Sequence, residues 1–408
     1  MTRKITNIVI ASAFHPVEGG IETYMYQVAK NWPHGESVVF TQGLATDEPQ
    51  PVSAFKVHRL HHKSGSYILN LLRLAWWVRL HPQTCFLLAS NRDFVKRETP
   101  RVRRVLQELS KQGRCILQAA TVIPNGVIGL IAKRVSGGKL VVYLHGSEIN
   151  RFKKKLNNRM LLKAVLSNAD CIIANSRYTA SLVSDLHLRE DVLRTVNIGA
   201  DTSRFFPLDS RGRILSELAI PRDAFVFLTM GRLIRRKGHD RVLQALAGIG
   251  SSHDNAYYVI AGRGPEERRL RELVEQLGVS ERVRFTGYIP HHQVNDYLNS
   301  CDCFIMANRE ESGDVEGYGL VFLEAAACRK PAIAGRSGGA VEAVLHDVTG
   351  LLVDPSRPDE IARAMELMIT DPELASRLAG NGFSRVRGEL NWETVCSIIN
   401  TQILELFI

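Results

Sequence analysis

Residues 303–334 read CFIMANREESGDVEGYGLVFLEAAACRKPAIA. An apolar run, Cys303–Met306, precedes a polar connection, an apolar helical pattern from Gly319 onward, and a second apolar run, Pro331–Ala334. Short continuous apolar runs on either side of a helix are typical of parallel strands covered on both faces of a sheet. The stretch therefore predicts one strand–helix–strand unit of an α/β domain.

The same alternation runs through the whole chain. Further apolar runs of strand length are Ile5–Ala11, Ser37–Thr41, Phe55–Leu60, Cys115–Ala119, Lys139–Leu144, Cys171–Ala174, Val192–Asn197, Phe225–Gly231, Tyr257–Ala261 and Val283–Thr286. Amphipathic helical stretches between them are Ile21–Trp32, Asp240–Leu246, Pro265–Leu277 and Pro358–Ile369. Two such series in 408 residues predict two Rossmann-like domains, each with a doubly wound parallel sheet.

The boundary between the two series lies near Gly199–Pro207. We predict a first domain over residues 1–199 and a second over residues 200–390. The helical pattern over residues 391–408, after Gly388, is predicted to cross back onto the first domain. Because open α/β sheets bind ligands beyond the carboxyl ends of their strands, the site is expected in a cleft between two facing domains.

Composition indicates an ordinary globular protein. Hydrophobic residues make up 45% and charged residues 23% of the chain. The net charge of +10 favours phosphorylated or otherwise anionic partners. The seven cysteines are expected to be buried free thiols, as in a reducing cytoplasm. The N-terminus does not resemble a signal peptide, and no stretch has the length and apolar character of a membrane span.

Residues 316–324, EGYGLVFLE, carry two glutamates with seven residues between them. A helix is predicted to begin near Gly317, and the start of a helix suits a diphosphate. The backbone N–H groups expected to bind it belong to Gly317, Tyr318, Gly319 and Leu320. Glu324, about two turns along, can accept from a pair of ribose hydroxyls, and Glu316 from a sugar hydroxyl. Paired glutamates on a helix are usually solvated surface charges, but their place after a strand favours binding.

Residues 231–238, GRLIRRKG, form a basic loop after an apolar strand. Arg232 and Lys237 are candidates to clamp a diphosphate leaving group as its negative charge grows. Arg235 and Arg236 are expected to face solvent. A basic loop without a ligand explains the pattern about equally well when it is taken alone.

Two weaker signals follow other strands. Gly19 and Gly20 lie at a strand-to-helix turn, where the backbone can approach a phosphate or a sugar closely. His145 follows the strand Lys139–Leu144 and is a candidate to contact the donor sugar. A lone histidine in such a place is more often structural.

Residues 262–265, GRGP, resemble a dinucleotide-binding turn but lack its third glycine. They are interpreted as a strand-to-helix turn near the nucleotide. The nucleobase is expected near Arg263 and the segment Thr286–Ile289, which contains Tyr288.

Taken together and in this order, these sites resemble family 4 of the retaining glycosyltransferases, which have the GT-B fold. The resemblance covers most of the chain, from Gly19-Gly20 to Asn391-Trp392-Glu393. The run Gly313–Gly317 with Glu324 looks closest to the mannosyltransferases that build phosphatidylinositol mannosides. Arg329-Lys330 and the basic segment 86–111 depart from the family.

The resemblance implies a retaining hexosyltransferase that needs neither a metal nor a cofactor. Its donor would be a nucleotide-diphosphate sugar, GDP-mannose or a UDP-sugar, and its acceptor a lipid-linked or saccharide hydroxyl. Arg232 and Lys237 would stabilise the departing diphosphate together with N–H groups of Gly20 and residues 317–319. Glu316 would orient the sugar, Glu324 would bind the ribose, and His145 would contact the sugar.

A membrane-facing segment is predicted as well. Residues 67–80, YILNLLRLAWWVRL, mix basic, aromatic and leucine side chains, and further basic residues follow at 92–104 and at 151–155. Such a pattern can dock on anionic lipid, although a helix packed on the first sheet is the commoner explanation. The predicted location is cytoplasmic, with a peripheral place on the inner face of the cell membrane.

Two alternatives remain open from the sequence. Another GT-B enzyme, a sugar-nucleotide epimerase or a phosphorylase, would share the fold. A nucleic-acid-binding protein would explain the charge of +10, but the sequence contains no helix-turn-helix, zinc module or aromatic RNA-binding motif, so no nucleic-acid partner is expected.

Overall fold

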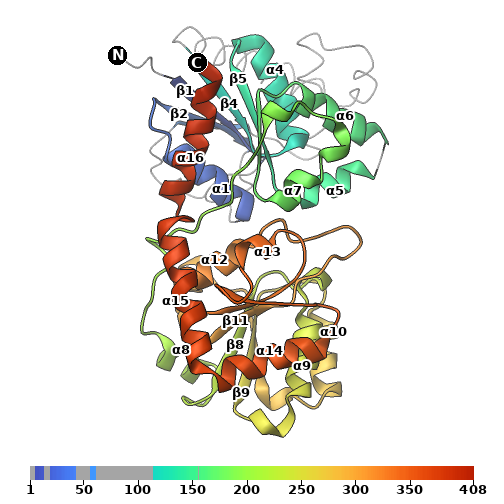
Figure 1. Cartoon of the computed structure of the whole chain (residues 1–408), viewed down its shortest axis with the longest axis vertical. Coiled ribbons are helices and arrows are strands. Elements are labelled where there is room, and N and C mark those ends of the chain that lie inside the picture. Colours follow the sequence, from blue (N-terminus) through green and yellow to red (C-terminus); the bar gives the residue numbers. More distant parts are fainter. Residues whose placement is uncertain (1–4, 13–18, 43–55, 61–113, 155) are drawn as a thin grey trace. The chain divides into compact units, whose positions relative to one another are not determined.

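The computed structural model describes residues 5–12, 19–42, 56–60, 114–154 and 156–408. The chain divides into two compact units. The first comprises residues 1–196 and 396–408, and the second comprises residues 197–395. Each unit contains one sheet with helices on both faces (Figure 1).

A seven-stranded parallel sheet forms the centre of the first unit, in the order β3-β2-β1-β4-β5-β6-β7. Its strands are β1 (Ile5–Ile10), β2 (Ser37–Gln42), β3 (Lys56–Leu60), β4 (Arg114–Ala119), β5 (Lys139–Leu144), β6 (Cys171–Ala174) and β7 (Leu193–Thr195). Its helices are α1 (Gly20–Lys30), α4 (Val127–Ser136), α5 (Ser147–Lys153), α6 (Leu156–Ser167) and α7 (Arg177–Ser181). In register, Ile8 of β1 pairs with Val38 of β2 and Leu117 of β4.

The second unit has a six-stranded parallel sheet, in the order β10-β9-β8-β11-β12-β13. Its strands are β8 (Phe225–Met230), β9 (Ala256–Ala261), β10 (Val283–Gly287), β11 (Cys303–Met306), β12 (Ala332–Gly335) and β13 (Gly350–Val353). Its helices are α8 (Arg211–Glu217), α9 (His239–Gly248), α10 (Glu267–Gln276), α11 (Val294–Ser300), α12 (Leu320–Ala327), α13 (Ala340–Ala343), α14 (Pro358–Thr370) and α15 (Pro372–Gly388). Helices α9, α10 and α14 cover one face, and on the other Phe322 of α12 packs edge-on against Phe304 of β11.

In both sheets the strand order along the chain reverses at one point. This point lies between β1 and β4 in the first sheet and between β8 and β11 in the second. In the second unit β8 and β11 are parallel neighbours, and Phe227 and Leu228 pair with Cys303 and Phe304. The connections that leave β8 and β11 therefore diverge to opposite faces of the sheet, and in open α/β sheets such a point forms a crevice at the carboxyl edge. This crevice is where an α/β sheet offers a ligand site, and the loops that follow β8 and β11 border it.

Helix α16 (Trp392–Leu404) is followed by a short 3-10 helix, Glu405–Phe407, and its residues from Cys396 onward belong to the first unit. Asn400 donates a hydrogen bond of 2.9 Å to the carbonyl of Asn31, and Arg194 of β7 donates one of 2.9 Å to Gln402. Figure 1 shows α16 beside α1 in this unit. The last helix thus covers a face of the sheet formed by the first half of the chain.

The sequence predicts the α/β fold with two doubly wound parallel sheets correctly. The strands Lys139–Leu144, Cys171–Ala174 and Cys303–Met306 have the predicted bounds. Strand β13 is not among the predicted strands, because it consists of a glycine and only three apolar residues, a run too short to be distinctive. Helix α12 begins at Leu320, three residues after the predicted start near Gly317.

The six cysteines of the described ranges are buried and free, as predicted. Among the helices in those ranges, none has the length and apolar character required to cross a bilayer. The predicted membrane-facing stretch at 67–80, the basic residues at 92–104 and the segment 86–111 lie outside the described residues.

Candidate active site

Two loops meet at the carboxyl edge of the second sheet, one after β8 and one after β11. Gly238, at φ 75°, makes their contact possible, because a Cβ atom there would lie 1.9 Å from the carbonyl oxygen of Ala307. The N–H of Arg309 also donates a hydrogen bond of 2.8 Å to the carbonyl of Arg236. The basic loop 231–238 and the glutamate-bearing loop are thus fixed against each other.

Glu316 is the centre of this arrangement. Its Oε2 atom accepts from Lys237 Nζ at 2.6 Å and from Arg236 Nη1 at 2.5 Å. Only 14% of its side chain is exposed, and burial alone would raise its pKa. The two neighbouring cations outweigh burial and lower the pKa of Glu316 to about 2. The carboxylate is therefore ionised throughout the physiological range.

Arg236 departs from prediction. It was expected to face solvent, yet only 18% of its side chain is exposed. Its Nε atom donates to Asp314 at 3.1 Å while its Nη1 atom bonds Glu316. A planar guanidinium bridges two carboxylates with N–H groups in a fixed geometry, which the single ammonium of a lysine does not reproduce. The signal that would have identified Arg236 is the pair of acids two residues apart, Asp314 and Glu316, opposite adjacent cations.

Asp314 is presented by a tight turn over residues 311–314. Glu311 and Asp314 exchange two backbone hydrogen bonds of 2.9 Å each. Ser312 and Gly313 between them have φ angles of 55° and 80°. A serine in this region is unusual and is retained where the surrounding structure requires the turn. Here the turn aims the Asp314 carboxylate at the Arg236 guanidinium.

The start of α12 is shaped by Gly319, which caps the helix at φ 94°. A Cβ atom at this position would lie 2.7 Å from the ring of Phe322. This left-handed residue delays the helix from Gly317 to Leu320, so residues 317–319 form a buried approach to the first turn. The Tyr318 hydroxyl points inward and donates to the carbonyl of Glu342 at 3.5 Å, so its side chain is not available to a ligand.

Glu324 lies on the second turn of α12, in an environment unlike that of Glu316. Burial raises the pKa of Glu324 to about 7, Arg204 opposes the rise and Asp201 adds to it. No described side chain is recorded as an ion-pair partner of Glu324. The pKa values of the two glutamates of one motif thus shift in opposite directions, because two cations contact the first and burial dominates the second.

Three other cations of the predicted donor-side loops are exposed. Arg232 is exposed, and no acidic side chain in the described ranges forms an ion pair with it. Arg263 is exposed too, and its Nε lies 3.7 Å from the Cβ position of Gly287, one residue before Tyr288. The Tyr288 side chain is 58% exposed. Arg235 faces solvent as predicted, with 58% of its side chain exposed.

The other predicted residues belong to the first unit. Gly19 and Gly20 are exposed at the start of α1. His145 follows β5, and its Nε2 contacts the carbonyl of Ala120 at 2.8 Å. Since a carbonyl only accepts, Nε2 carries a proton, which leaves Nδ1 as an acceptor in the neutral ring. Whether these residues reach the donor stays a prediction.

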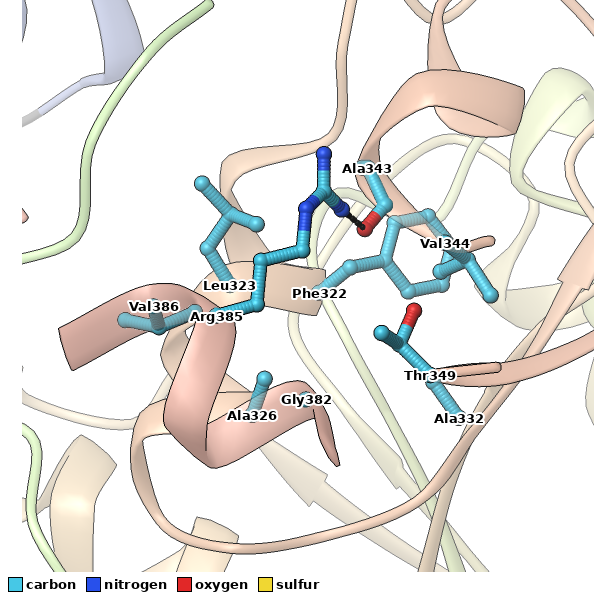
Figure 2. A pocket seen from close by; sticks show the side chains of 10 residues that line it. All are labelled: Phe322, Leu323, Ala326, Ala332, Ala343, Val344, Thr349, Gly382, Arg385 and Val386. Carbon is cyan, nitrogen blue, oxygen red and sulfur yellow. Dashed lines mark hydrogen bonds between the residues drawn. The ribbon is translucent and has the colours of Figure 1, made fainter. Parts of the chain in front are cut away.

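A small cavity lies between α12, α13 and α15. Figure 2 shows Phe322, Leu323 and Arg385 on its walls, with Arg385 donating to the carbonyl of Ala343 at 3.0 Å. Its volume of about 10 Å³ has room for about one water molecule. This cavity is far too small for a sugar nucleotide and is separate from the loops that carry Glu316 and Lys237.

Comparisons with known protein families match both halves of the chain. Residues 18–204 match the family described as Glycosyltransferase Family 4. Residues 210–385 match the family described as Glycosyl transferases group 1. The two matches together take in nearly all of both units.

Among curated proteins, the chain is similar to a GDP-mannose-dependent alpha-(1-6)-phosphatidylinositol monomannoside mannosyltransferase of Mycolicibacterium smegmatis. The two are 29% identical over 390 residues, which are 95% of each chain. A second relative is the lipopolysaccharide core biosynthesis glycosyltransferase LpsE of Rhizobium meliloti. It is 32% identical over 228 residues, which are 56% of this chain and 62% of LpsE.

Two solved structures share the fold over almost the whole chain. Anabaena Alr3699/HepE, in complex with UDP and glucose, superposes with a TM-score of 0.74 at 20% identity and covers 98% of this chain and 99% of its own. Sucrose-phosphate synthase from Thermosynechococcus elongatus gives a TM-score of 0.72 at 22% identity and covers 99% of each chain. The two sheets of this chain have matching strand orders. Together with the family matches, this shows that the chain belongs to the GT-B glycosyltransferases, with a family 4 domain in its first half and a group 1 domain in its second.

Proposed function

We propose that this glycosyltransferase transfers a hexose, with mannose as the first candidate, from a nucleotide-diphosphate sugar to a hydroxyl of a lipid-linked or saccharide acceptor. The observation that carries the proposal is the ionised Glu316 beside Lys237, in a loop that leads directly into the first turn of α12. Cations and free N–H groups suit a diphosphate, and a carboxylate suits sugar hydroxyls. The name of the mycobacterial relative supports GDP-mannose and a glycolipid acceptor.

Leaving-group stabilisation is the main chemical task of such a site. The bond from the anomeric carbon to the diphosphate breaks, and the electron pair stays on the phosphate oxygen. Arg232, exposed and without a recorded ion pair in the described ranges, would meet this growing charge together with Lys237. N–H groups of Gly20 and of residues 317–319 would add to it. No metal ion is required by this scheme, and we expect turnover to be unchanged by EDTA.

Glu316 would orient the hexose, and Glu324 would bind the ribose hydroxyls. A carboxylate whose pKa is about 2 is a weak base and a weak nucleophile, which favours an orienting role for Glu316 over covalent attack. We propose transfer with retention, as the resemblance to a retaining family implies, by front-face departure and attack, with the leaving phosphate taking the acceptor proton. His145 would contact the sugar, and Arg263 and Tyr288 would border the base. Proton NMR of the first product tests retention, since an inverted anomeric centre would contradict it.

The acceptor side is proposed to lie at an anionic membrane surface. Besides the stretch at 67–80, α6 carries large exposed side chains on one face: Leu156 is 73% exposed and Met160 63% exposed, and Lys163 follows at the next turn. Apolar and basic side chains on one helix face can bind anionic lipid. Flotation with vesicles of anionic lipid, at low and high salt, tests this. The double variant Leu156→Ser with Met160→Ser should float less, and no flotation of the unchanged protein at low salt would remove the proposal.

The decisive test of the donor assignment is binding. The melting temperature is measured with GDP, UDP and ADP and with their sugars. A nucleotide at a hundred times its Kd should stabilise the protein by about 2.7 kcal/mol, a rise of several degrees. Lys237→Ala should remove most of the rise. Arg235→Ala, a neighbouring exposed cation, is the matched control and should keep it.

Turnover with and without acceptor completes the test. A transferase needs the acceptor hydroxyl, whereas an epimerase changes its nucleotide sugar without one and a phosphorylase uses free phosphate. If no nucleotide raises the melting temperature of the unchanged protein, the proposed function is wrong.

A further inference from the structure

Both cations that contact Glu316 bind the same oxygen atom. Lys237 Nζ and Arg236 Nη1 approach Oε2 at 2.6 Å and 2.5 Å. Within the described ranges, no group donates a hydrogen bond to Oε1. The carboxylate is thus fixed through one oxygen, while the other keeps its capacity to accept a hydrogen bond.

Arg236 and Lys237 differ in how they balance the charge of Glu316. With Lys237 alone, one carboxylate would face one ammonium in a partly buried pair, and each charge would largely neutralise the other. Arg236 adds a second positive charge, and its other edge is tied to Asp314 at 3.1 Å. Glu316 therefore keeps a counter-ion even when Lys237 turns to another anion.

The position of Arg236 is fixed from three directions. Its backbone carbonyl accepts the N–H of Arg309 at 2.8 Å, its Nε bonds Asp314 and its Nη1 bonds Glu316. Arg235, one residue earlier, has 58% of its side chain exposed, whereas Arg236 has 18%. Such fixation suits a residue that holds a neighbour in place rather than one that moves with a ligand.

We propose that Arg236 is a positioning residue of the donor site: it takes over the charge of Glu316 so that Lys237 is available to the donor diphosphate, and it holds Glu316 with Oε1 open to a sugar hydroxyl. This inference rests on the proposed function. It assigns Arg236 no contact with the donor, so its effect must pass through Glu316.

A double-mutant cycle tests this dependence. Binding of GDP and UDP is measured by calorimetry for the unchanged protein, Arg236→Ala, Glu316→Gln and the double variant. Loss of Arg236 leaves Lys237 held by Glu316, so the diphosphate should bind about tenfold more weakly, as is typical for a lost charged hydrogen bond. In the Glu316→Gln background no carboxylate holds Lys237, so the same change should matter by less than about twofold. Equal losses in both backgrounds would overturn the inference.

Arg236→Lys separates charge from orientation. It keeps the positive charge but loses the fixed planar geometry that holds Glu316. The Kd for the diphosphate should therefore stay within about threefold, while kcat with the sugar donor falls about tenfold or more. A kcat equal to that of the unchanged protein would overturn the orienting role. If Arg236→Ala unfolds, Arg236→Gln, closer in size, takes its place in the cycle. Failure of the unchanged protein to bind GDP, UDP or ADP would refute the proposed function instead, so the two failures are distinguishable.

Discussion

Replacing Glu324 by glutamine is expected to stabilise the protein at neutral pH while weakening donor binding. Burial raises the pKa of this carboxyl from its ordinary 4.5 to about 7. The folded state therefore holds the proton more tightly than the unfolded state does. The stability present at low pH is lost progressively between pH 4.5 and pH 7, and above pH 7 the full loss remains.

The size of the effect follows from the shift. A rise from 4.5 to about 7 is 2.5 units, and at 1.36 kcal/mol for each unit it corresponds to about 3 kcal/mol. Glutamine cannot ionise, so Glu324→Gln should recover about 1 to 3 kcal/mol at pH 8 and almost nothing at pH 4.5. The lower limit allows for the amide, whose N–H groups also need partners at a partly buried site.

Urea unfolding at pH 4.5 and pH 8 measures the difference directly, and calorimetry with the donor nucleotide measures binding. Glu275→Gln, an exposed glutamate of α10 in the same unit, is the matched control and should leave both midpoints unchanged. Equal stability changes of Glu324→Gln at the two pH values would refute the reasoning. A loss of stability at pH 8 would also refute it, because the ionised carboxylate would then be a stabilising group.

Three further outcomes are expected. Arg232→Ala should lower kcat by about two to three orders of magnitude but leave the free energy of unfolding within about 0.5 kcal/mol, because the side chain is exposed; unchanged kcat would exclude Arg232 from leaving-group stabilisation. Gly319→Ala should lower the free energy of unfolding by about 1 to 3 kcal/mol, since its φ of 94° and the ring of Phe322, 2.7 Å from the Cβ position, both oppose a side chain. Gly380→Ala is the control, because open space surrounds this residue, and it should not destabilise α15 in the same urea titration. The pKa of Glu316, lowered to about 2, gives stability that is fully present above pH 4.5 and is lost as pH falls through 2. Glu316→Gln should therefore flatten the acid branch of a profile of the free energy of unfolding against pH. An unchanged acid branch would contradict the pairing with Lys237.

The fold was accessible from the sequence because its strands are continuous apolar runs. Segments such as Lys139–Leu144 have both faces covered, and buried parallel strands carry this pattern without interruption. Boundaries depended on single residues with unusual backbone angles. Because Gly319 has a φ of 94°, α12 begins at Leu320 and not near Gly317. A pattern of apolar residues does not predict such a backbone angle.

The candidate site was accessible in part. The basic loop and the glutamate motif were recognised as separate signals, and the strand order brings them together at neighbouring strands β8 and β11. Arg236 was missed because its role depends on Asp314 and Glu316, some eighty residues later in the chain. The opposite behaviour of Glu316 and Glu324 was equally hidden, since burial and neighbouring charges are properties of the folded chain.

The division of the chain into units has a consequence for biosynthesis. The second unit is one continuous segment, residues 197–395, and it can complete its sheet while translation is still in progress. The first unit is synthesised earlier but receives α16 only some two hundred residues later, when residues 396–408 leave the ribosome. Until then the surface around Asn31 lacks its covering helix, so nascent chains that are arrested before residue 396 should be the species that chaperones and proteases capture most readily.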